Sequence, residues 1–231
     1  MTEIIDDSVD AMLARPPRKG MYVVIEGNEG SGKTTQCKAI KSWLIQTLRV
    51  QAVTVREPGG DPFGEALRQV LKNPEYVREA DEELDVFTAA RKGMRRRVVQ
   101  PALDGGKWVI ADRSELSTFV YQAFAGGLDP MTVAASQAKV GDICKPDLFI
   151  ILDIPYELSQ LRLTERGETK DYFESRGDIY LRTVSDGYRA VGPFARELGY
   201  NVANIDGTQK QAFVTETIKD LIVERFFRPI D

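Results

Sequence analysis

The chain has 231 residues, of which 42% are hydrophobic and 29% are charged, so it can form a packed core, and intrinsic disorder is excluded as the default. Its formal net charge of −4 supplies no basic surface for gripping duplex nucleic acid, and we expect no nucleic-acid partner. The absence of histidine excludes imidazole general bases, Ser-His and Cys-His nucleophiles and histidine metal ligands.

The sequence carries no signal for membranes or secretion. It has no run of 18 apolar residues, and its acidic beginning lacks the apolar core of a signal peptide. Its two cysteines are too few for a zinc site or a disulfide framework. We therefore expect a cytoplasmic protein with no membrane partner.

Residues 1–19 are expected to form an N-terminal extension. They begin polar and acidic and end in the breaker Arg15-Pro16-Pro17-Arg18-Lys19. A flexible tail is the favoured interpretation, and an arm that docks on a partner subunit is the alternative. The composition does not change again after this segment, so we expect a single domain over residues 20–231.

Short apolar runs then alternate with helix-compatible segments. The apolar runs are rich in Val and Ile and predict five buried strands: Tyr22–Glu26, Ala52–Arg56, Trp108–Asp112, Leu148–Asp153 and Val202–Asp206. The predicted helices lie between and after them: Lys33–Leu48, Pro62–Lys72, Glu82–Leu103, Thr118–Phe124, Met131–Ile143, Tyr156–Arg166, Ile179–Arg196 and Gln209–Phe227. This alternation predicts an α/β fold whose parallel sheet is covered by helices on both faces.

A phosphate-binding motif follows the first predicted strand and opens the first predicted helix. The pattern G-x-x-x-x-G-K-[ST] is matched by Gly27-Asn28-Glu29-Gly30-Ser31-Gly32-Lys33-Thr34. The glycines let backbone N–H groups surround phosphate oxygens, and the helix N-terminus adds a partial positive charge. We expect Lys33 to reach the β- and γ-phosphates of a nucleoside triphosphate and Thr34 to bind Mg²⁺. The motif alone leaves kinase, GTPase and ATPase open.

A sharp turn is predicted at the end of the second strand, where the chain reads Arg56-Glu57-Pro58-Gly59-Gly60. The carboxyl ends of parallel strands face the ligand crevice of an α/β sheet, so Arg56 is expected near the phosphate loop, where its guanidinium can bind phosphate. Proline and the glycines favour a tight turn, with a cis peptide before Pro58 as one form of it. An ordinary strand-to-helix turn is the alternative.

This turn and three later blocks resemble the thymidylate kinase family. Residues 56–65 match the family turn R-E-P-G-G-T-P-x-G-E, with Asp61 in place of Thr. The other blocks agree in order and spacing: Leu84–Arg91 resembles L-x-F-x-A-x-R, Asp112–Gln122 resembles D-R-[YH]-x-x-S-x-x-A-Y-Q, and Pro146–Pro155 resembles P-D-L-x-x-x-L-D-x-P. With the phosphate loop there are five spaced blocks, which rarely coincide by chance, and the resemblance covers the chain from about residue 20 to the C-terminus. The acidic loop residue and the arginines of 161–168 resemble the bacterial type.

The resemblance implies a P-loop kinase with a five-stranded parallel sheet and a small lid over about 161–177. It implies Mg²⁺-dependent transfer of the γ-phosphoryl group of ATP to dTMP, giving dTDP and ADP, and, because family members are usually homodimers, a homodimer. The acceptor is already a phosphate anion and needs no general base, so a histidine-free chain suits a reaction that depends on positioning and charge stabilisation.

The resemblance also implies four sets of site residues. The ATP-binding set is Gly27, Asn28, Glu29, Gly30, Ser31, Gly32, Lys33, Thr34 and Thr35. The acceptor-binding set is Arg56, Pro58, Phe87, Arg91, Arg113, Ser117, Thr118, Tyr121 and Gln122. The metal-binding pair is Thr34 and Asp112, and the catalytic set is Lys33, Arg113, Arg166, Arg162 and Glu29.

Arginines are expected to hold the acceptor phosphate. Arg56 and Arg113 match the family arginines with this role, and a structural salt bridge is the alternative for each. Asp112 either orients the Mg²⁺ water shell or caps its strand. Glu29 occupies the acidic loop position that the family associates with the acceptor's 3′-hydroxyl or with the catalytic phosphates.

The acceptor base is expected between Phe87 and Arg91, which lie four apart on one helix face. The alternative places Phe87 in the core and Arg91 in solvent. Thr118 and Gln122 match polar residues near the base, and Tyr121 matches the tyrosine that crowds the 2′ position and favours deoxyribose.

The predicted lid carries Arg162 and Arg166 on one helical face, and we expect one or both to touch the transferring phosphoryl group. A solvated charged helix end is the alternative.

Four positions depart from the family pattern: Ser114 stands for Tyr or His, Asp61 for Thr, Ala123–Gly127 for G-x-G-R-G, and Tyr172 for the arginine of D-R-x-E. These departures suggest a shifted or widened acceptor specificity, with a 5-substituted dUMP such as 5-hydroxymethyl-dUMP, or another deoxynucleoside monophosphate, as the alternative acceptor. A kinase for dCMP, UMP or a shikimate-like alcohol, and a catalytically quiet nucleotide-binding protein, also remain open. A GTPase would carry an Asn-Lys-x-Asp motif, and the chain has none.

Overall fold

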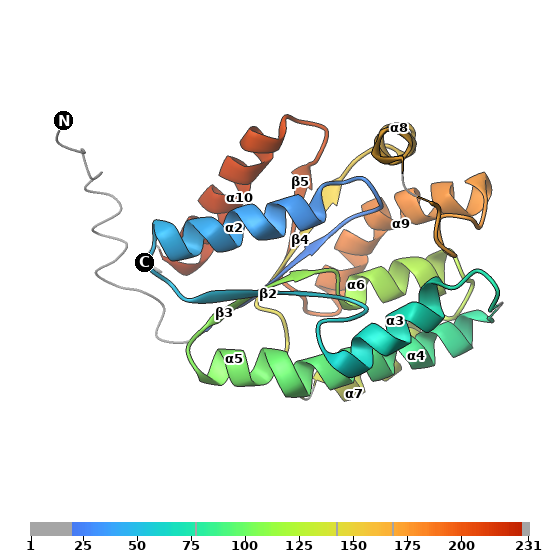
Figure 1. The fold of residues 1–231 in the computed structure, drawn as a ribbon, viewed down its shortest axis with the longest axis horizontal. Helices are drawn as coiled ribbons and strands as arrows, with labels where there is room; N and C mark the ends of the chain where they lie inside the picture. The colour runs from blue at the N-terminus through green and yellow to red at the C-terminus, as the bar shows by residue number, and fades with distance from the viewer. Residues whose placement is uncertain (1–19, 77, 142, 168, 228–231) are drawn as a thin grey trace.

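The computed structural model describes residues 20–76, 78–141, 143–167 and 169–227 (Figure 1). The expected N-terminal extension, residues 1–19, lies outside the described residues. In the described part of the chain, no helix is long and apolar enough to cross a bilayer.

A single parallel sheet forms the centre of the fold. Its strands are β1 (Tyr22–Glu26), β2 (Ala52–Arg56), β3 (Trp108–Asp112), β4 (Leu148–Asp153) and β5 (Val202–Asp206), in the order β2-β3-β1-β4-β5. All five predicted strands are confirmed with their bounds. Continuous apolar runs suit the central strands β1, β3 and β4, which are buried on both faces, whereas the edge strands β2 and β5 are only partly buried.

Helices cover both faces of the sheet, as predicted (Figure 1). Alternate residues of β1 point to opposite faces. Val23 and Ile25 pack in a core cluster with α2 (Lys33–Gln46) and α10 (Gln211–Phe226). Tyr22 and Val24 pack in the cluster on the other face. Among the helices that contribute to that second cluster are α3 (Pro62–Lys72), α4 (Ala80–Met94), α7 (Pro130–Gly141) and α9 (Asp178–Glu197).

The long helix predicted over Glu82–Leu103 follows a continuous helical path with a wider turn inside it. The path consists of α4, a π-helical turn η1 (Arg95–Val99) and α5 (Gln100–Asp104). The wider turn lies just before Pro101, whose ring and missing N–H disfavour a regular α-helical ladder. The apolar residues along the whole helical path, among them Leu84, Met94, Val99 and Leu103, are buried in the core.

The other predicted helices are found with small changes at their ends. The segment predicted over Thr118–Phe124 is a short α6 (Glu115–Thr118) followed by a π-helical η2 (Phe119–Phe124). Between β4 and α9, α8 (Tyr156–Arg166) has the predicted bounds. The carboxyl ends of β1, β2, β3 and β4 meet at one edge of the sheet, and the candidate site lies there.

Candidate active site

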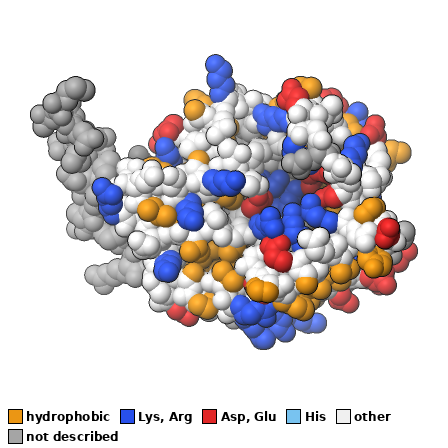
Figure 2. Space-filling model, in the orientation of Figure 1, with side chains coloured by type: hydrophobic (Ala, Val, Ile, Leu, Met, Phe, Trp, Pro, Cys, Tyr) orange, Lys and Arg blue, Asp and Glu red, His pale blue; other side chains and the backbone are white. Residues whose placement is uncertain are grey.

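A cleft of about 800 Å³ lies at this edge of the sheet. Figure 2 shows a hollow on this side of the molecule with Lys and Arg side chains around it. Most of the predicted site residues line the cleft: Glu29, Gly30, Gly32, Lys33, Thr34, Thr35, Arg56, Pro58, Phe87, Arg91, Asp112, Arg113, Ser117, Thr118, Tyr121, Gln122 and Arg166. Four predicted residues are not among the lining residues: Gly27, Asn28, Ser31 and Arg162.

The phosphate loop joins β1 to α2. Gly27 adopts φ 146°, and a Cβ there would lie 2.7 Å from the backbone oxygen of Leu152, so only glycine fits. The Lys33 ammonium donates to the backbone oxygen of Asn28 at 2.8 Å, inside the curve of the loop. Burial and the nearby Arg113 lower the pKa of Lys33 to about 8. The loop therefore presents a buried cation where a phosphate chain would lie.

Two oxygen ligands lie side by side at the start of α2. The hydroxyl of Thr34 donates to the carboxylate of Asp112, at the end of β3. The structure brings together the two residues predicted to bind metal, although they are 78 positions apart. Hydroxyl and carboxylate oxygens are ligands that Mg²⁺ accepts, so this pair fits the ion.

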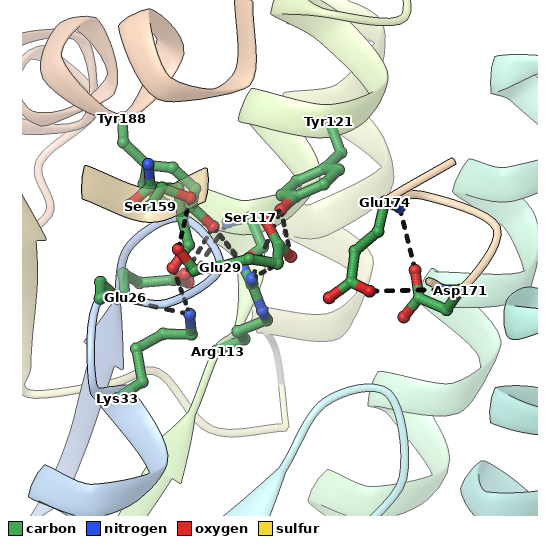
Figure 3. A network of polar contacts seen from close by, with 12 residues as sticks. Glu26, Glu29, Lys33, Arg113, Ser117, Tyr121, Ser159, Asp171, Glu174 and Tyr188 are labelled. Carbon is green, nitrogen blue, oxygen red and sulfur yellow. Dashed lines mark hydrogen bonds and ion pairs between the residues drawn. The ribbon is translucent and has the colours of Figure 1, made fainter. Parts of the chain in front are cut away.

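Arg113 lies at the centre of the cleft's polar network (Figure 3). One end of its guanidinium donates to Glu29 at 2.6 Å, and the other end donates to Ser117 at 3.1 Å and to the hydroxyl of Tyr188. The hydroxyl of Tyr121 donates to both oxygens of Glu29 at 2.6 Å. Burial opposes ionisation of Glu29, but Arg113 and Lys33 outweigh it and hold the pKa of this carboxyl below its usual range. Glu29 and Arg113 are therefore a charged pair that faces the cleft.

The far end of the cleft combines aromatic rings with a buried arginine. Phe87 and Arg91 both line it, and Arg91 is buried, so the solvent alternative for Arg91 is wrong. The Arg91 guanidinium pairs with Glu57 at 2.5 Å and donates to Thr118 at 2.9 Å. Sequence reasoning missed Phe173, whose ring lies 5.8 Å from that of Phe87 and forms another wall.

The turn after β2 has the predicted cis peptide bond between Glu57 and Pro58. Sequence reasoning missed the role of Glu57, which holds Arg91. The sequence offered one signal for this role: Glu57 follows Arg56 at the carboxyl end of a predicted strand, where adjacent charged residues indicate a functional site. Arg56 itself pairs with the exposed Glu65 at 2.8 Å on the rim of the cleft.

The two lid arginines reach different cavities. Arg166 lines the cleft and pairs with Glu174 at 2.8 Å. Arg162 donates to the backbone oxygens of Gly30 at 3.0 Å and Gly207 at 3.3 Å. It lines a second cavity of about 280 Å³ on the other side of the phosphate loop, together with Gln209.

Of the four departures from the family pattern, only Ser114 lines the cleft. Its buried hydroxyl donates to Glu57 at 3.0 Å. Asp61 is buried and caps the N-terminus of α3, where it accepts from the Gly64 N–H at 3.1 Å and pairs with Arg97.

The remaining two departures are also absent from the residues that line the cleft: Ala123–Gly127 and Tyr172. The ring of Tyr172 packs under the guanidinium of Arg78, 4.4 Å from its centroid. In the other segment, Ala123 is buried in the core and Phe124 and Ala125 pack against it.

The sheet order, the phosphate loop at the end of β1 and the charged cleft define a P-loop kinase fold. The sequence model described as Thymidylate kinase matches residues 25–218. Among similar curated proteins, each described as "Thymidylate kinase", one from Bradyrhizobium sp. (strain ORS 278) is 36% identical over 96% of this chain and 97% of its own length. One from Chromohalobacter salexigens is 35% identical over 89% of this chain and 96% of its own. The chain belongs to the thymidylate kinase family.

Proposed function

We propose that this protein transfers the γ-phosphoryl group of ATP to dTMP with Mg²⁺, giving dTDP and ADP. The observation that carries the proposal is that Lys33 of the phosphate loop, the Arg113–Glu29 pair and the Phe87–Arg91 end all line one cleft. A donor phosphate chain, an acceptor phosphate and a planar base need these features in that order.

The donor occupies the phosphate loop. Backbone N–H groups of the loop and Lys33 bind its phosphates, and the partial positive charge of the α2 N-terminus favours them. The second cavity begins at Gly30, so the nucleoside of ATP extends into it past Arg162 and Gln209. Thr34 and Asp112 would hold Mg²⁺, which would supply positive charge against the phosphates of the donor.

The acceptor occupies the rest of the cleft. Arg113 and Arg56, which both line the cleft, bind its phosphate, with Arg56 approaching from the rim. The base lies against Phe87, over the guanidinium of Arg91, which Glu57 and Thr118 hold in place. Arg166 adds positive charge from α8 where negative charge develops during transfer.

The acceptor preference is the first prediction. We expect dTMP to give the highest kcat/KM in a coupled ADP-release assay against dUMP, 5-hydroxymethyl-dUMP, dCMP, dGMP and UMP. The departures at Asp61, Ala123–Gly127 and Tyr172 do not line the cleft, so they leave the base pocket unchanged. The departure at Ser114 does line it, and it alone favours a 5-substituted dUMP as the second candidate. An equal or higher kcat/KM for 5-hydroxymethyl-dUMP would show that Ser114 has changed the specificity, and no turnover with any acceptor would indicate a quiet nucleotide-binding protein.

We further propose that the protein is a homodimer that packs through α3. This helix carries Phe63, Ala66, Leu67 and Val70 at the spacing of one helical face, and all but the half-buried Leu67 are exposed. Figure 2 shows hydrophobic side chains along its lower right edge, where α3 and α4 lie in Figure 1.

Charges on the neighbouring α4 favour a second copy of this chain as the partner. Its exposed face begins with Asp81 and Asp85 and ends with Lys92, and the exposed Arg96 follows in η1. In a two-fold arrangement with antiparallel helices, the acidic end of one copy meets the basic end of the other.

A lysine in the α3 stripe is expected to separate the dimer. Val70→Lys places a charge on a side chain that is 41% exposed in the single chain and buried in the proposed dimer, and we expect the dimer Kd to rise about 30-fold or more. Sedimentation velocity over a concentration series measures this. Phe213→Lys on α10 is the matched control, because that side chain is 64% exposed and lies away from the stripe. A monomeric unsubstituted protein, or equal dissociation of both variants, would contradict the proposal.

A further inference from the structure

A buried carboxylate, Glu26, lies behind Arg113 and takes no part in the steps above. It is the last residue of β1, its exposed fraction is 0%, and it is not among the residues that line the cleft. Its side chain therefore acts on the site only through its neighbours.

Both carboxylate oxygens of Glu26 accept hydrogen bonds from the segment after Arg113 (Figure 3). The N–H of Ser114 donates to Oε1 at 2.8 Å, and the N–H of Ser117 donates to the same oxygen at 3.2 Å. The hydroxyl of Ser117 donates to Oε2 at 2.7 Å, and the hydroxyl of Tyr188 lies 3.4 Å from that oxygen. Glu26 thus joins the end of β1 to the start of α6 and to α9.

The same two hydroxyls hold the guanidinium of Arg113. Its Nη1 donates to the Ser117 hydroxyl at 3.1 Å and to the Tyr188 hydroxyl, and the two hydroxyl oxygens lie 2.7 Å apart. A guanidinium has only donors, so both hydroxyls must offer it a lone pair and send their own protons elsewhere. Glu26 takes the Ser117 proton at 2.7 Å, and the Tyr188 hydroxyl donates either to the Ser117 oxygen at 2.7 Å or to Glu26 at 3.4 Å.

Arg113 depends on such support because of its backbone. Its φ of 73° lies in the left-handed region, which non-glycine residues adopt only where their surroundings hold them. The N–H groups of Ser114, the residue directly after Arg113, and of Ser117 donate to Glu26, and these hydrogen bonds hold the chain in that conformation.

We infer that Glu26 is a positioning residue for the acceptor: through Ser117 and Tyr188 it orients Arg113 toward the acceptor phosphate. The inference rests on the proposed function, in which Arg113 binds that phosphate.

The protonation state of Glu26 gives the inference a second readout. Burial raises the pKa of Glu26 to about 7, although the hydrogen bond from Ser117 and the charge of Arg113 oppose the rise. The charged and titratable groups that face it are Arg113 after β3, Tyr188 on α9 and Lys33 on α2. Above this pKa the carboxylate accepts from the hydroxyls. Below this pKa, protonated Glu26 donates a hydrogen bond to one of the two hydroxyls. Fewer acceptors are then left for the hydroxyl protons, so the hydrogen bonds that orient Arg113 weaken.

The test compares Glu26→Gln and Tyr188→Phe with the unsubstituted protein. Glutamine keeps the shape and one acceptor oxygen, and phenylalanine keeps the ring and removes only the hydroxyl. Since hydrogen bonds to charged groups are being lost, we expect the KM for dTMP to rise about tenfold in each variant, and the KM for ATP to change by less than about twofold. The ratio of unsubstituted to Glu26→Gln kcat/KM for dTMP should grow as the pH rises through 7, and this ratio cancels the titration of the substrate itself.

The control is Ile218→Val, a methyl deletion in the core cluster on the other face of the sheet. It lowers stability without touching the site, so its KM for dTMP should not change. Unchanged KM values for dTMP in both variants would overturn the inference about Glu26, and so would a ratio of unsubstituted to Glu26→Gln kcat/KM that does not change with pH. The proposed function would still stand if the unsubstituted protein turned over dTMP. If the unsubstituted protein neither turned over dTMP nor bound it by calorimetry, both proposals would fail.

Discussion

Lys33→Met is expected to lower kcat by about 10³-fold at saturating substrates. The Lys33 ammonium lies 2.8 Å from the Asn28 backbone oxygen and 3.5 Å from the Ser31 hydroxyl, in the curve of the loop that holds the donor phosphates. Methionine has a similar length and no charge, so the substitution removes the cation and leaves the packing of α2 on the sheet nearly unchanged. Most of the lost stabilisation is in the transition state, where charge spreads over the transferring oxygens.

The coupled ADP-release assay measures this loss, and a nucleotide-binding titration separates it from weaker ATP affinity. Lys41→Met is the matched control, because this lysine lies on the same helix and is not among the residues that line either cavity. A Lys33→Met protein that kept more than about a tenth of the normal kcat would show that the loop lysine is not used for transition-state stabilisation.

Arg166→Ala is expected to lower kcat by about 10³-fold, as loss of an arginine that stabilises the transferring phosphoryl group does in related chemistry. Arg162→Ala is expected to raise the KM for ATP and to change kcat far less. The physical reason is location. Arg166 lines the cleft that holds both phosphates, whereas Arg162 lines the second cavity and donates to Gly30 and Gly207.

Steady-state kinetics with each substrate varied in turn distinguish the two effects. Arg182→Ala is the control, because this exposed arginine of α9 pairs with Glu157 on α8 and is not among the cleft residues. Equal losses of kcat in the two lid variants would mean that both arginines turn inward together when substrates bind. A larger loss in Arg162→Ala would reverse the assignment.

The strands were predictable because burial on both faces leaves a strong local pattern. The central strands show this most clearly: Leu148–Asp153 is apolar at every position but the last, whereas the edge strands Ala52–Arg56 and Val202–Asp206 are only partly buried. The bounds of all five strands matched the prediction. Helix interiors were harder. The segment predicted over Thr118–Phe124 is π-helical from its second residue onward, and an apolar pattern does not distinguish hydrogen bonds that span four residues from those that span five.

Some of the predicted site residues could be placed from the sequence, and others could not. The phosphate loop is a contiguous motif, and Arg56 and Arg113 follow strands whose carboxyl ends face the crevice, so their presence at the cleft followed from chain order. The spacing of Arg162 and Arg166 on one helical face suggested a shared target. Their divergence depends on where α8 packs against the phosphate loop, which no local pattern encodes.

The sequence by itself determined the phosphate loop, the alternation of strands and helices, and the resemblance that the family match then confirmed. These features depend on residues that are close along the chain. The tertiary structure decided which arginine faces which cavity, that Glu57 holds Arg91 and that Glu26 lies behind Arg113. Glu26 and Tyr188 are 162 positions apart, and their contact arises only because β1 and α9 pack together. Spacing along a chain specifies local structure, whereas the partners of a buried charge are set by which elements meet.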